Sequence, residues 1–379
     1  MKKKTRKNKS SCLLLVVLLC IGTIIFAQPN RFGHNYEFPD IFYFDSFFET
    51  SQEISIVAVG DLMMGSWIVD IVGEQTVDYP FSGTAGLVKN ADIAVANLEA
   101  PFTSSADRYE GKTFTFKVPG YMAPAVKRAG FDVLNLANNH ILDYGESGLN
   151  ETTGILDSLG LHYSGAGQSR TEACSPALVR VKNRKIAFFG YSMTYPSAFW
   201  ATDENCGTCY PILERMQADI RSAKQIADWV VVSFHWGQEK NPVPRDYQIL
   251  YAHKAIDNGA DLVLGHHPHV MQGLEWYKNK LIAYSLGNYV FGSFSKTATQ
   301  SFILKVVFSK TASLSAVVYP IDVDNKRVRF QPRLLSGNQR EEVVDSLNAL
   351  SRKMNMGHDI IDKRGVSTGL INTLMVKKR

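Results

Sequence analysis

The sequence predicts an α/β sandwich, because short apolar strands alternate with helical patterns from residue 54 onward. The strands are apolar at nearly every position, which is typical of strands covered on both faces. They are expected at Ile54–Val59, Ile93–Ala96, Val133–Leu136, Ile186–Phe189, Val230–Ser233, Leu262–Leu264 and Leu281–Tyr284. The helices between them are expected at Met122–Ala129, Gly148–Leu159, Ile212–Asp228 and Tyr247–Asn258. With 379 residues, 45% of them hydrophobic, the chain can bury the core of such a fold.

The pattern changes to extended runs after residue 294. Ser301–Phe308, Leu314–Val323 and Arg327–Leu335 are predicted to form a β-meander that finishes a second sheet. A helix is expected at Glu341–Met354, followed by a basic tail. We therefore expect one domain over residues 54–335 and a C-terminal helix and tail over residues 336–379. Residues 28–53 are aromatic without clear periodicity, and we interpret them as an arm or linker.

The first 27 residues have the pattern of an export signal. Six basic residues and no acidic one precede an apolar run over residues 12–26, which is short for a membrane-spanning helix. Cleavage after Ala27 is expected, and an uncleaved signal anchor is the alternative. The remainder should then be exported: periplasmic, otherwise extracytoplasmic, or anchored to the cytoplasmic membrane. Without this segment 35 basic residues balance 36 acidic ones, which argues against a nucleic-acid partner.

Three cysteines remain after residue 27. Cys206 and Cys209 are separated by Gly-Thr in a polar loop, and an oxidising compartment favours a local disulfide between them. A zinc knuckle is the weaker alternative because no second cysteine pair exists. Cys174 is expected to be buried and unpaired.

Polar residues follow five of the predicted strands directly, and these residues are candidates for a functional site. They are Asp61; Asn97 and Glu99; Asn138, Asn139 and His140; His235; and His266, His267 and His269. Ligands of open α/β sheets bind at the carboxyl ends of the strands, so we expect these side chains to meet. Carboxylate, amide oxygen and imidazole together favour one or two divalent metal ions of the Mn, Fe or Zn type over calcium. Two such ions could bind a phosphate group between them.

Structural roles are the alternative for each of these residues. Asp61 and Glu99 could cap helices, the histidines could close a hydrogen-bonded turn, and His140 could support a neighbouring ligand. The segment from Ser285 to Asn288 is expected to be a structural turn, with a role in lining the pocket as the alternative. Glu239 could orient a metal ligand or contact a cationic group of the substrate.

The order and spacing of the motifs resemble the CapA family of capsule biosynthesis, which includes PgsA-type proteins of poly-γ-glutamate synthesis and is similar to the calcineurin-like metallophosphoesterases. The resemblance covers about residues 54–295. The motifs are Gly60-Asp61, Asn97-Leu98-Glu99, Asn138-Asn139-His140-x-x-Asp143-Tyr144-Gly145, His235-Trp236-Gly237, Gly265-His266-His267-Pro268-His269 and Ser285-Leu286-Gly287-Asn288-Tyr289-Val290-Phe291. The resemblance implies a four-layer α/β/β/α metallophosphoesterase-like sandwich with two mostly mixed sheets.

The resemblance also implies a role for each candidate. Asp61 and His269 would bind a first metal, Glu99 would bridge both metals, and Asn139, His235 and His267 would bind the second. His140 would act as general acid or stabilise charge near the leaving group. Phosphoesterases carry a histidine two residues after the first aspartate, where this chain has Met63. The first metal site is therefore expected to be weak, empty or completed by His266.

The implied function is synthesis or export of an anionic polymer, alongside membrane-bound capsule synthase components. The alternatives are a phosphoesterase that acts on a phosphoester substrate outside the membrane, and a non-catalytic subunit that binds the polymer.

Overall fold

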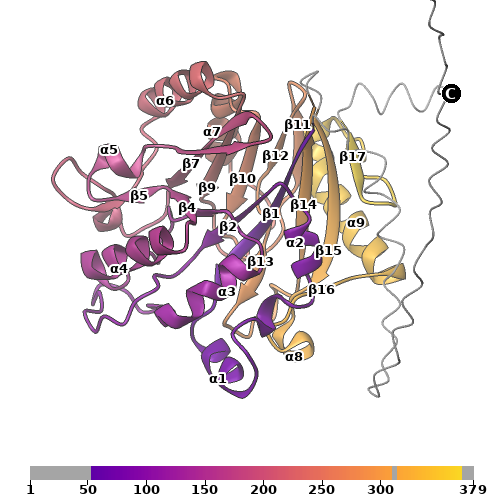
Figure 1. The fold of residues 1–379 in the computed structure, drawn as a ribbon. Coiled ribbons are helices and arrows are strands. Elements are labelled where there is room, and N and C mark those ends of the chain that lie inside the picture. The colour runs from indigo at the N-terminus through magenta and orange to yellow at the C-terminus, as the bar shows by residue number, and fades with distance from the viewer. Residues whose placement is uncertain (1–52, 310–313, 369–379) are drawn as a thin grey trace, which may run out of the picture. The chain divides into compact units, whose positions relative to one another are not determined.

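The computed structural model describes residues 53–309 and 314–368, and their strands form two large sheets (Figure 1). The predicted signal segment and nearly all of the predicted aromatic arm therefore lie outside the described residues. Among the residues that are described, no helix combines the length and apolar composition needed to cross a membrane.

The first sheet has nine strands and is built around β1 (Ile54–Met63). On one side of β1, three strands follow in parallel: β2 (Ile93–Leu98), β3 (Val133–Asn135) and β4 (His162–Ser164). On the other side lie β13 (Asn288–Phe291), parallel to the end of β1, and β14 (Gln300–Phe308), antiparallel to its beginning. The sheet continues through β15 (Leu314–Asp322), which pairs with β16 (Arg333–Leu334) and β17 (Val366–Thr368).

The second sheet has six strands, and its four inner strands are parallel. These are β7 (Arg184–Ser192), β9 (Trp229–His235), β10 (Leu262–His266) and β12 (Lys280–Ala283). The edges are antiparallel additions, β6 (Ala177–Val181) and β11 (Leu274–Tyr277). Two short strands, β5 (Ala166–Gly167) and β8 (Gly207–Thr208), form a separate ribbon.

Helices cover the outer faces of both sheets, which gives four layers. The nine-stranded sheet packs against α1 (Trp67–Glu74), α2 (Ala85–Lys89), α3 (Ala123–Arg128) and α4 (Gly145–Ser158). The six-stranded sheet packs against α6 (Leu213–Ile226) and α7 (Asp246–Asp257). Shorter helices are α5 (Arg170–Ala173) and α8 (Asn325–Val328), with 3-10 turns at Tyr79–Phe81, Gly120–Met122, Ser197–Phe199 and Arg352–Asn355.

Strand β1 explains how two sheets stack. Val57 and Val59 point into the core beneath the helices, whereas Ile54, Ile56 and Ala58 point into the core between the sheets. Side chains alternate along a strand, so an entirely apolar strand fills two cores at once. Helix α9 (Gly337–Ser351) packs one face against the core between the sheets, through residues such as Val343 and Leu347. The predicted α/β/β/α sandwich is confirmed, as is each predicted strand and helix up to residue 284, with small shifts at the ends.

Two predictions about the C-terminal half need correction. The meander does not finish a second sheet, because β14 pairs with β1 and so extends the sheet that the N-terminal strands begin. The predicted strand at Arg327–Leu335 is mostly absent: α8 occupies its start and only Arg333–Leu334 is extended. Arg329 and Phe330 have φ angles of 49° and 62°, in the left-handed region, which interrupts an extended chain.

The predicted Cys206–Cys209 disulfide is wrong, because Cys209 pairs with Cys174 and Cys206 is free. The two residues between Cys206 and Cys209 form β8, which pairs with β5 in extended conformation. Residues three apart on an extended segment face opposite sides. Accordingly Cys206 packs against the core of the nine-stranded sheet and Cys209 lies in that of the six-stranded sheet.

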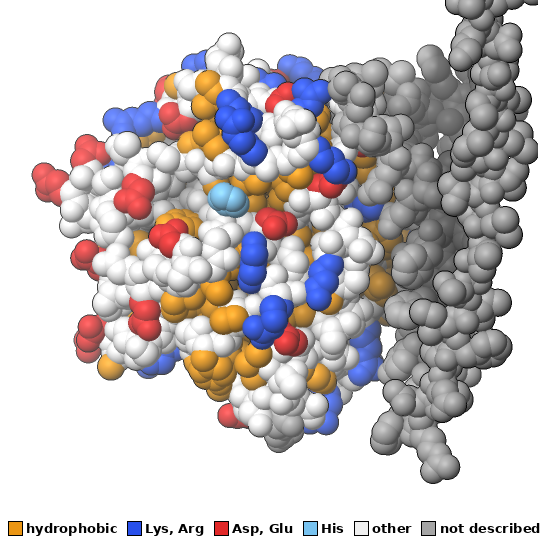
Figure 2. All heavy atoms as spheres, in the orientation of Figure 1, with side chains coloured by type: hydrophobic (Ala, Val, Ile, Leu, Met, Phe, Trp, Pro, Cys, Tyr) orange, Lys and Arg blue, Asp and Glu red, His pale blue; other side chains and the backbone are white. Residues whose placement is uncertain are grey.

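Figure 2 shows one face of the molecule, on which charges of both signs are interspersed with apolar side chains. Acidic side chains are frequent toward the edge where α4 and α5 lie, and basic ones are spread across the middle of the view. This mixture is typical of a solvated protein surface.

Candidate metal centre

The candidate residues meet where the parallel strands of both sheets end. In the nine-stranded sheet, Asp61 of β1 lies opposite Asn97 of β2 and Asn288 of β13. In the six-stranded sheet, His235 of β9 lies opposite His266 of β10. A hydrogen bond joins the two ends, because His267 N donates to Asp61 Oδ2 over 3.3 Å. The predicted convergence of strand ends is therefore observed.

Two groups of side chains have the spacing of metal ligands. Asp61, Glu99 and His269 form one group, and Glu99, His235 and His267 form the other, with the ligand atoms of each group within 4.8 Å of one another. Glu99 belongs to both groups. Its Oε1 lies 3.6 Å from Nε2 of His235 and 3.6 Å from Nε2 of His269. This arrangement fits two metal ions with Glu99 between them.

Glu99 is the residue that most clearly fits a cation. Its side chain is fully buried, and Oε1 has no hydrogen-bond partner among the described residues. The other oxygen accepts a hydrogen bond from Asn97 Nδ2 over 3.2 Å. Burial, together with the charge of Asp61, raises the pKa of Glu99 well above its usual value. A buried carboxylate with a free oxygen between imidazoles is costly alone, and a bound cation would compensate it.

The imidazoles of the second group are held in the neutral form that binds metals. Burial lowers the pKa of His267 to about 3, and burial with the nearby His267 lowers that of His235 well below its usual value. Neutral imidazoles offer a lone pair without first losing a proton. Asn139 joins this group, because its Oδ1 lies 2.8 Å from Nε2 of His235. His267 Nδ1 lies 3.1 Å from the same nitrogen.

Within the first group, Asp61 and His269 form an ion pair. Nδ1 of His269 lies 3.1 Å from Oδ2 of Asp61. Although burial opposes it, the adjacent imidazoles of His266 and His269 hold the pKa of Asp61 well below its usual value. Burial also opposes the charged form of His269, but the bond to Asp61 raises the pKa of His269. A cation bound by these two residues would displace the shared proton.

His266 and Met63 bear on the completeness of the first group. Nδ1 of His266 lies 3.4 Å from Oδ1 of Asp61, and both ring nitrogens are buried without a hydrogen-bond partner among the described residues. Met63 is buried too, and its Sδ accepts a hydrogen bond from Gly65 N over 3.2 Å. His266 is thus a second imidazole beside Asp61, although it lies outside the two groups defined above.

Asparagines orient the ligands. Asn97 Nδ2 donates to Oδ1 of Asp61 over 2.9 Å as well as to Glu99, and its own Oδ1 accepts a hydrogen bond from Asn135. Oδ1 of Asn288 lies 2.9 Å from Nδ1 of His269. The Ser285–Asn288 segment was predicted to be a structural turn, with a role in lining the pocket as the alternative, and Asn288 of this segment contacts a candidate ligand.

The turn that carries the histidines is conformationally constrained. His267 and His269 have φ angles of 94° and 59°, which are uncommon for residues other than glycine. Gly265 precedes them, and a Cβ at this position would lie 1.9 Å from the carbonyl oxygen of Tyr284. Only glycine therefore lets β10 approach its neighbour closely enough to place both imidazoles.

His140 is part of a buried hydrogen-bonded set beside the second group. Its Nδ1 lies 2.6 Å from Oδ2 of Asp143, and Phe116 N donates to the same oxygen over 2.7 Å. Burial lowers the pKa of His140 even though Asp143 opposes the shift. With Nδ1–H directed at Asp143, Nε2 remains for other contacts.

Lys112 completes this set, and the sequence analysis missed it. Its Nζ lies 2.5 Å from Oδ1 of Asp143 and 3.0 Å from Nδ1 of His140, and it donates to the backbone oxygen of Asn139. The side chain is only 12% exposed, and burial lowers its pKa. Lys112 lies in an irregular segment without periodicity. The sequence signal for a nearby cation was Asp143, an acid in the same motif as His140.

The fold and site together define a class: a four-layer α/β/β/α protein with a candidate two-metal centre at the carboxyl ends of its strands. The chain belongs to the family described as bacterial capsule synthesis protein PGA_cap, whose sequence profile matches residues 55–293. The predicted resemblance to the CapA family is therefore confirmed.

Two relatives are CapA proteins of bacilli. The chain is 35% identical over 248 residues to "Capsule biosynthesis protein CapA" of Bacillus anthracis, covering 64% of this chain and 60% of the relative. It is 32% identical over 272 residues to "PGA biosynthesis protein CapA" of Bacillus subtilis (strain 168), covering 71% and 72%. The chain thus spans less than two thirds of the first relative's length.

Solved structures with a similar chain path include two proteins at 13% identity. One is a 5'-nucleotidase precursor from Thermus thermophilus, with a TM-score of 0.42 over 75% of this chain and 54% of that one. The other is the calcineurin-like phosphoesterase YfkN from Bacillus subtilis, with a TM-score of 0.41 over 80% and 97%.

Proposed function

We propose that this protein acts outside the cytoplasmic membrane in the synthesis or export of an anionic capsule polymer of the poly-γ-glutamate type, and that its metal centre is hydrolytic. Membership in the capsule synthesis family supports the biological role. The observation that carries the chemical part is Glu99, a buried carboxylate with one unpartnered oxygen that belongs to both ligand groups. In a purely structural site this buried charge would lack a compensating partner, which is unfavourable.

In this proposal, Asp61 and His269 hold one divalent cation, with His266 beside them, and Asn139, His235 and His267 hold the other. Ions of the Mn, Fe or Zn type suit this mixture of oxygen and nitrogen ligands. When bound, they would supply Lewis-acid polarisation of a phosphoryl or carbonyl oxygen.

The remaining chemistry belongs to the chain itself. Asp143 accepts the Nδ1 proton of His140, so the imidazole presents Nε2 to the substrate. Once Nε2 has taken up a proton from water, the ring can give that proton to a leaving oxygen. Lys112 offsets the charge of Asp143 and adds a cation beside the centre, which suits an anionic substrate. Its ammonium also fixes the backbone of Asn139, which is next to His140.

A free-standing phosphoesterase is the second candidate, and the His140–Asp143 pair favours it, because a protonated imidazole suits an alkoxide leaving group. A non-catalytic subunit that binds polymer would not need the His140–Asp143 pair. Membrane-bound capsule synthase components are the partners expected under the first proposal.

Metal content and hydrolysis distinguish these functions. The purified protein is loaded with Mn²⁺ or Zn²⁺, its metal stoichiometry is measured, and it is assayed on bis(p-nitrophenyl) phosphate and on poly-γ-glutamate. The proposal expects two ions per chain and turnover of poly-γ-glutamate that Glu99→Ala abolishes and the surface variant Glu342→Ala retains. Turnover of the phosphodiester alone supports the second candidate, and no turnover with at most one ion refutes a hydrolytic centre.

Export is tested separately in the native host. Cell fractionation with N-terminal sequencing of the mature protein should find it outside the cytoplasm, starting at Gln28 if the segment is cleaved or at the original N-terminus if it is an anchor. Recovery of the full-length protein in the cytoplasmic fraction would contradict the proposed location.

A further inference from the structure

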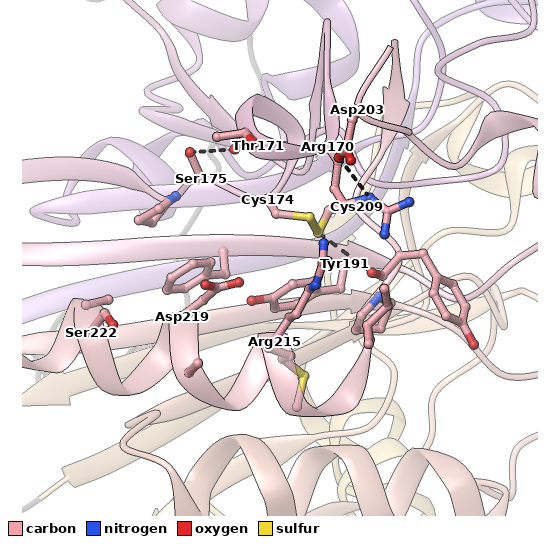
Figure 3. A pocket seen from close by; sticks show the side chains of 18 of the residues that line it. Arg170, Thr171, Cys174, Ser175, Tyr191, Asp203, Cys209, Arg215, Asp219 and Ser222 are labelled. Carbon is pink, nitrogen blue, oxygen red and sulfur yellow. Dashed lines mark hydrogen bonds and ion pairs between the residues drawn. A yellow bond between two sulfur atoms is a disulfide. The ribbon is translucent and has the colours of Figure 1, made fainter. Parts of the chain in front are cut away.

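A second cavity lies away from the metal centre, between α5, β7 and α6 (Figure 3). Its volume is about 600 Å³, within the size range of small-molecule sites. Phe189, Met216 and Ile226 contribute apolar surface, and the Cys174–Cys209 disulfide forms part of the wall. None of the candidate metal ligands lines it.

The tyrosine in the wall of this cavity carries an unpaired polar group. Tyr191 is 1% exposed, and its hydroxyl has no hydrogen-bond partner among the described residues. An unsatisfied buried hydroxyl is unfavourable, and Phe at this position would fill the same space without the loss. Nε of Arg170 is likewise buried without a hydrogen bond, and its nearest acid, Asp203, is 3.8 Å away and largely exposed.

Charges of opposite sign lie along the cavity. Figure 3 shows Arg170 and Arg215 near the disulfide, and Asp219 farther along beside Tyr191. Arg215 and Asp219 are four residues apart on α6, so they share a helix face about 6 Å apart along its axis. Within residues 53–309 and 314–368, they form no ion pair with each other. Burial raises the pKa of Asp219, although the charge of Arg215 opposes the shift.

This pattern matches a small zwitterion better than a lipid or a simple anion. A fatty acid would leave Asp219 without a cationic partner, and its own carboxylate would be repelled by the charge of Asp219. An inorganic anion would leave the apolar wall of the cavity uncovered. The two ends of a dipeptide are separated by about 7 Å when extended, which is close to the spacing of the charges on α6. Apolar side chains of the peptide would cover Phe189 and Met216.

We propose that this cavity is a binding site for a short peptide, with the carboxylate at Arg170 and Arg215, the ammonium at Asp219 and a hydrogen bond to the Tyr191 hydroxyl. The inference rests on this cavity alone and is independent of the proposed function of the metal centre.

Calorimetric titration of the full-length protein with leucyl-phenylalanine tests the proposal. We expect saturable binding with a Kd below about 1 mM. N-acetylation or C-terminal amidation of the dipeptide should each weaken binding about 10-fold or more, because each removes one charge-assisted contact. Laurate serves as the probe for an acyl-chain site.

Variants assign the two ends. Asp219→Asn should weaken binding of the free dipeptide about 10-fold and leave binding of the N-acetylated dipeptide unchanged. Arg215→Gln should likewise weaken binding of the free dipeptide and leave binding of the amidated dipeptide unchanged. Glu214→Gln, on an exposed position of α6 outside the cavity, is the matched control and should bind as wild type. Equal affinity for free and blocked dipeptides, absence of binding, or binding of laurate alone would each overturn the proposal. The comparison of free and blocked peptides on the wild type holds even if a variant misfolds.

Discussion

Replacing Glu99 by Gln should have opposite effects on stability with and without metal. Without metal, the buried carboxylate is unfavourable, since burial and the charge of Asp61 raise its pKa well above 4.5. A group with a raised folded-state pKa contributes stability below its unfolded pKa, and that contribution is lost as pH rises through the folded value. The metal-free wild type should therefore lose stability above pH 4.5 through Glu99. The Gln variant lacks this loss because an amide does not ionise.

The two effects are of similar size. Removing an unsatisfied buried oxygen stabilises a protein by about 1–3 kcal/mol. At about pH 8 the free energy of unfolding of the metal-free variant should therefore exceed that of the wild type by about this amount. Metal present at about 100 times its Kd stabilises the wild type by about 2.7 kcal/mol. Each kcal/mol shifts the melting temperature by roughly 2–4 °C in a domain of this scale. We thus expect a metal-induced rise of about 5–10 °C in the wild type and little rise in the variant.

Thermal and urea unfolding of chelator-treated protein, at pH 5 and pH 8 with and without Zn²⁺ or Mn²⁺, measures both effects. Glu342→Gln, on the exposed side of α9, should behave as wild type throughout. Two results would refute the reasoning: a full metal-induced shift in Glu99→Gln, or a metal-free variant that is less stable than the wild type at pH 8. The first would place the cations elsewhere, and the second would mean that Glu99 stabilises the fold without metal.

The other predictions concern the disulfide, the lysine beside the centre and a neutral histidine. Cys174 and Cys209 are 35 residues apart, so Cys174→Ala should lower the free energy of unfolding by about 4 kcal/mol in urea titrations, whereas Cys206→Ala should have little effect; the reverse ranking would contradict the observed pairing. Lys112→Met should lower kcat about 100-fold or more in the hydrolysis assay while Lys112→Arg retains part of it, and equal activity of both variants would exclude a role for the charge. Burial lowers the pKa of His267 to about 3, so its contribution to metal-free stability is present above pH 6.5 and is lost as pH falls toward 3. His267→Asn should flatten that part of the curve of unfolding free energy against pH. An unchanged slope would show that His267 is protonated in the folded protein.

What the sequence predicted well follows from short-range patterns with one physical meaning. β1 and β9 are apolar at successive positions because both faces are covered, and this pattern is visible without knowing what covers them. Parallel strands of one sheet end at a common edge, so Asp61 and Asn97 had to be close once both strands were assigned. The meeting of His267 with Asp61 was expected from the same strand-end rule, and the family resemblance added that the strands form two sheets.

The features that the sequence did not predict depend on contacts between residues distant in sequence. The spacing of Cys206 and Cys209 allows a local disulfide, and only the pairing of β8 with β5 directs the two side chains apart. Lys112 is one of many lysines, and its role depends on the path of an irregular segment that brings it to Asp143. A turn residue such as Asn288 looks structural until β13 is placed beside β1.

His266 shows how the centre accommodates the methionine at position 63. The thioether of Met63 accepts a backbone hydrogen bond and is a poor ligand for hard cations, so it adds nothing to Asp61 and His269. His266 lies beside Asp61, at 3.4 Å, in a place where both its nitrogens lack hydrogen-bond partners among the described residues. Two unsatisfied buried nitrogens are unfavourable, and helping to hold Asp61 ionised compensates only part of that loss. A cation at Asp61 would give one of these two nitrogens a partner, which is the role expected of His266 where the chain has Met63.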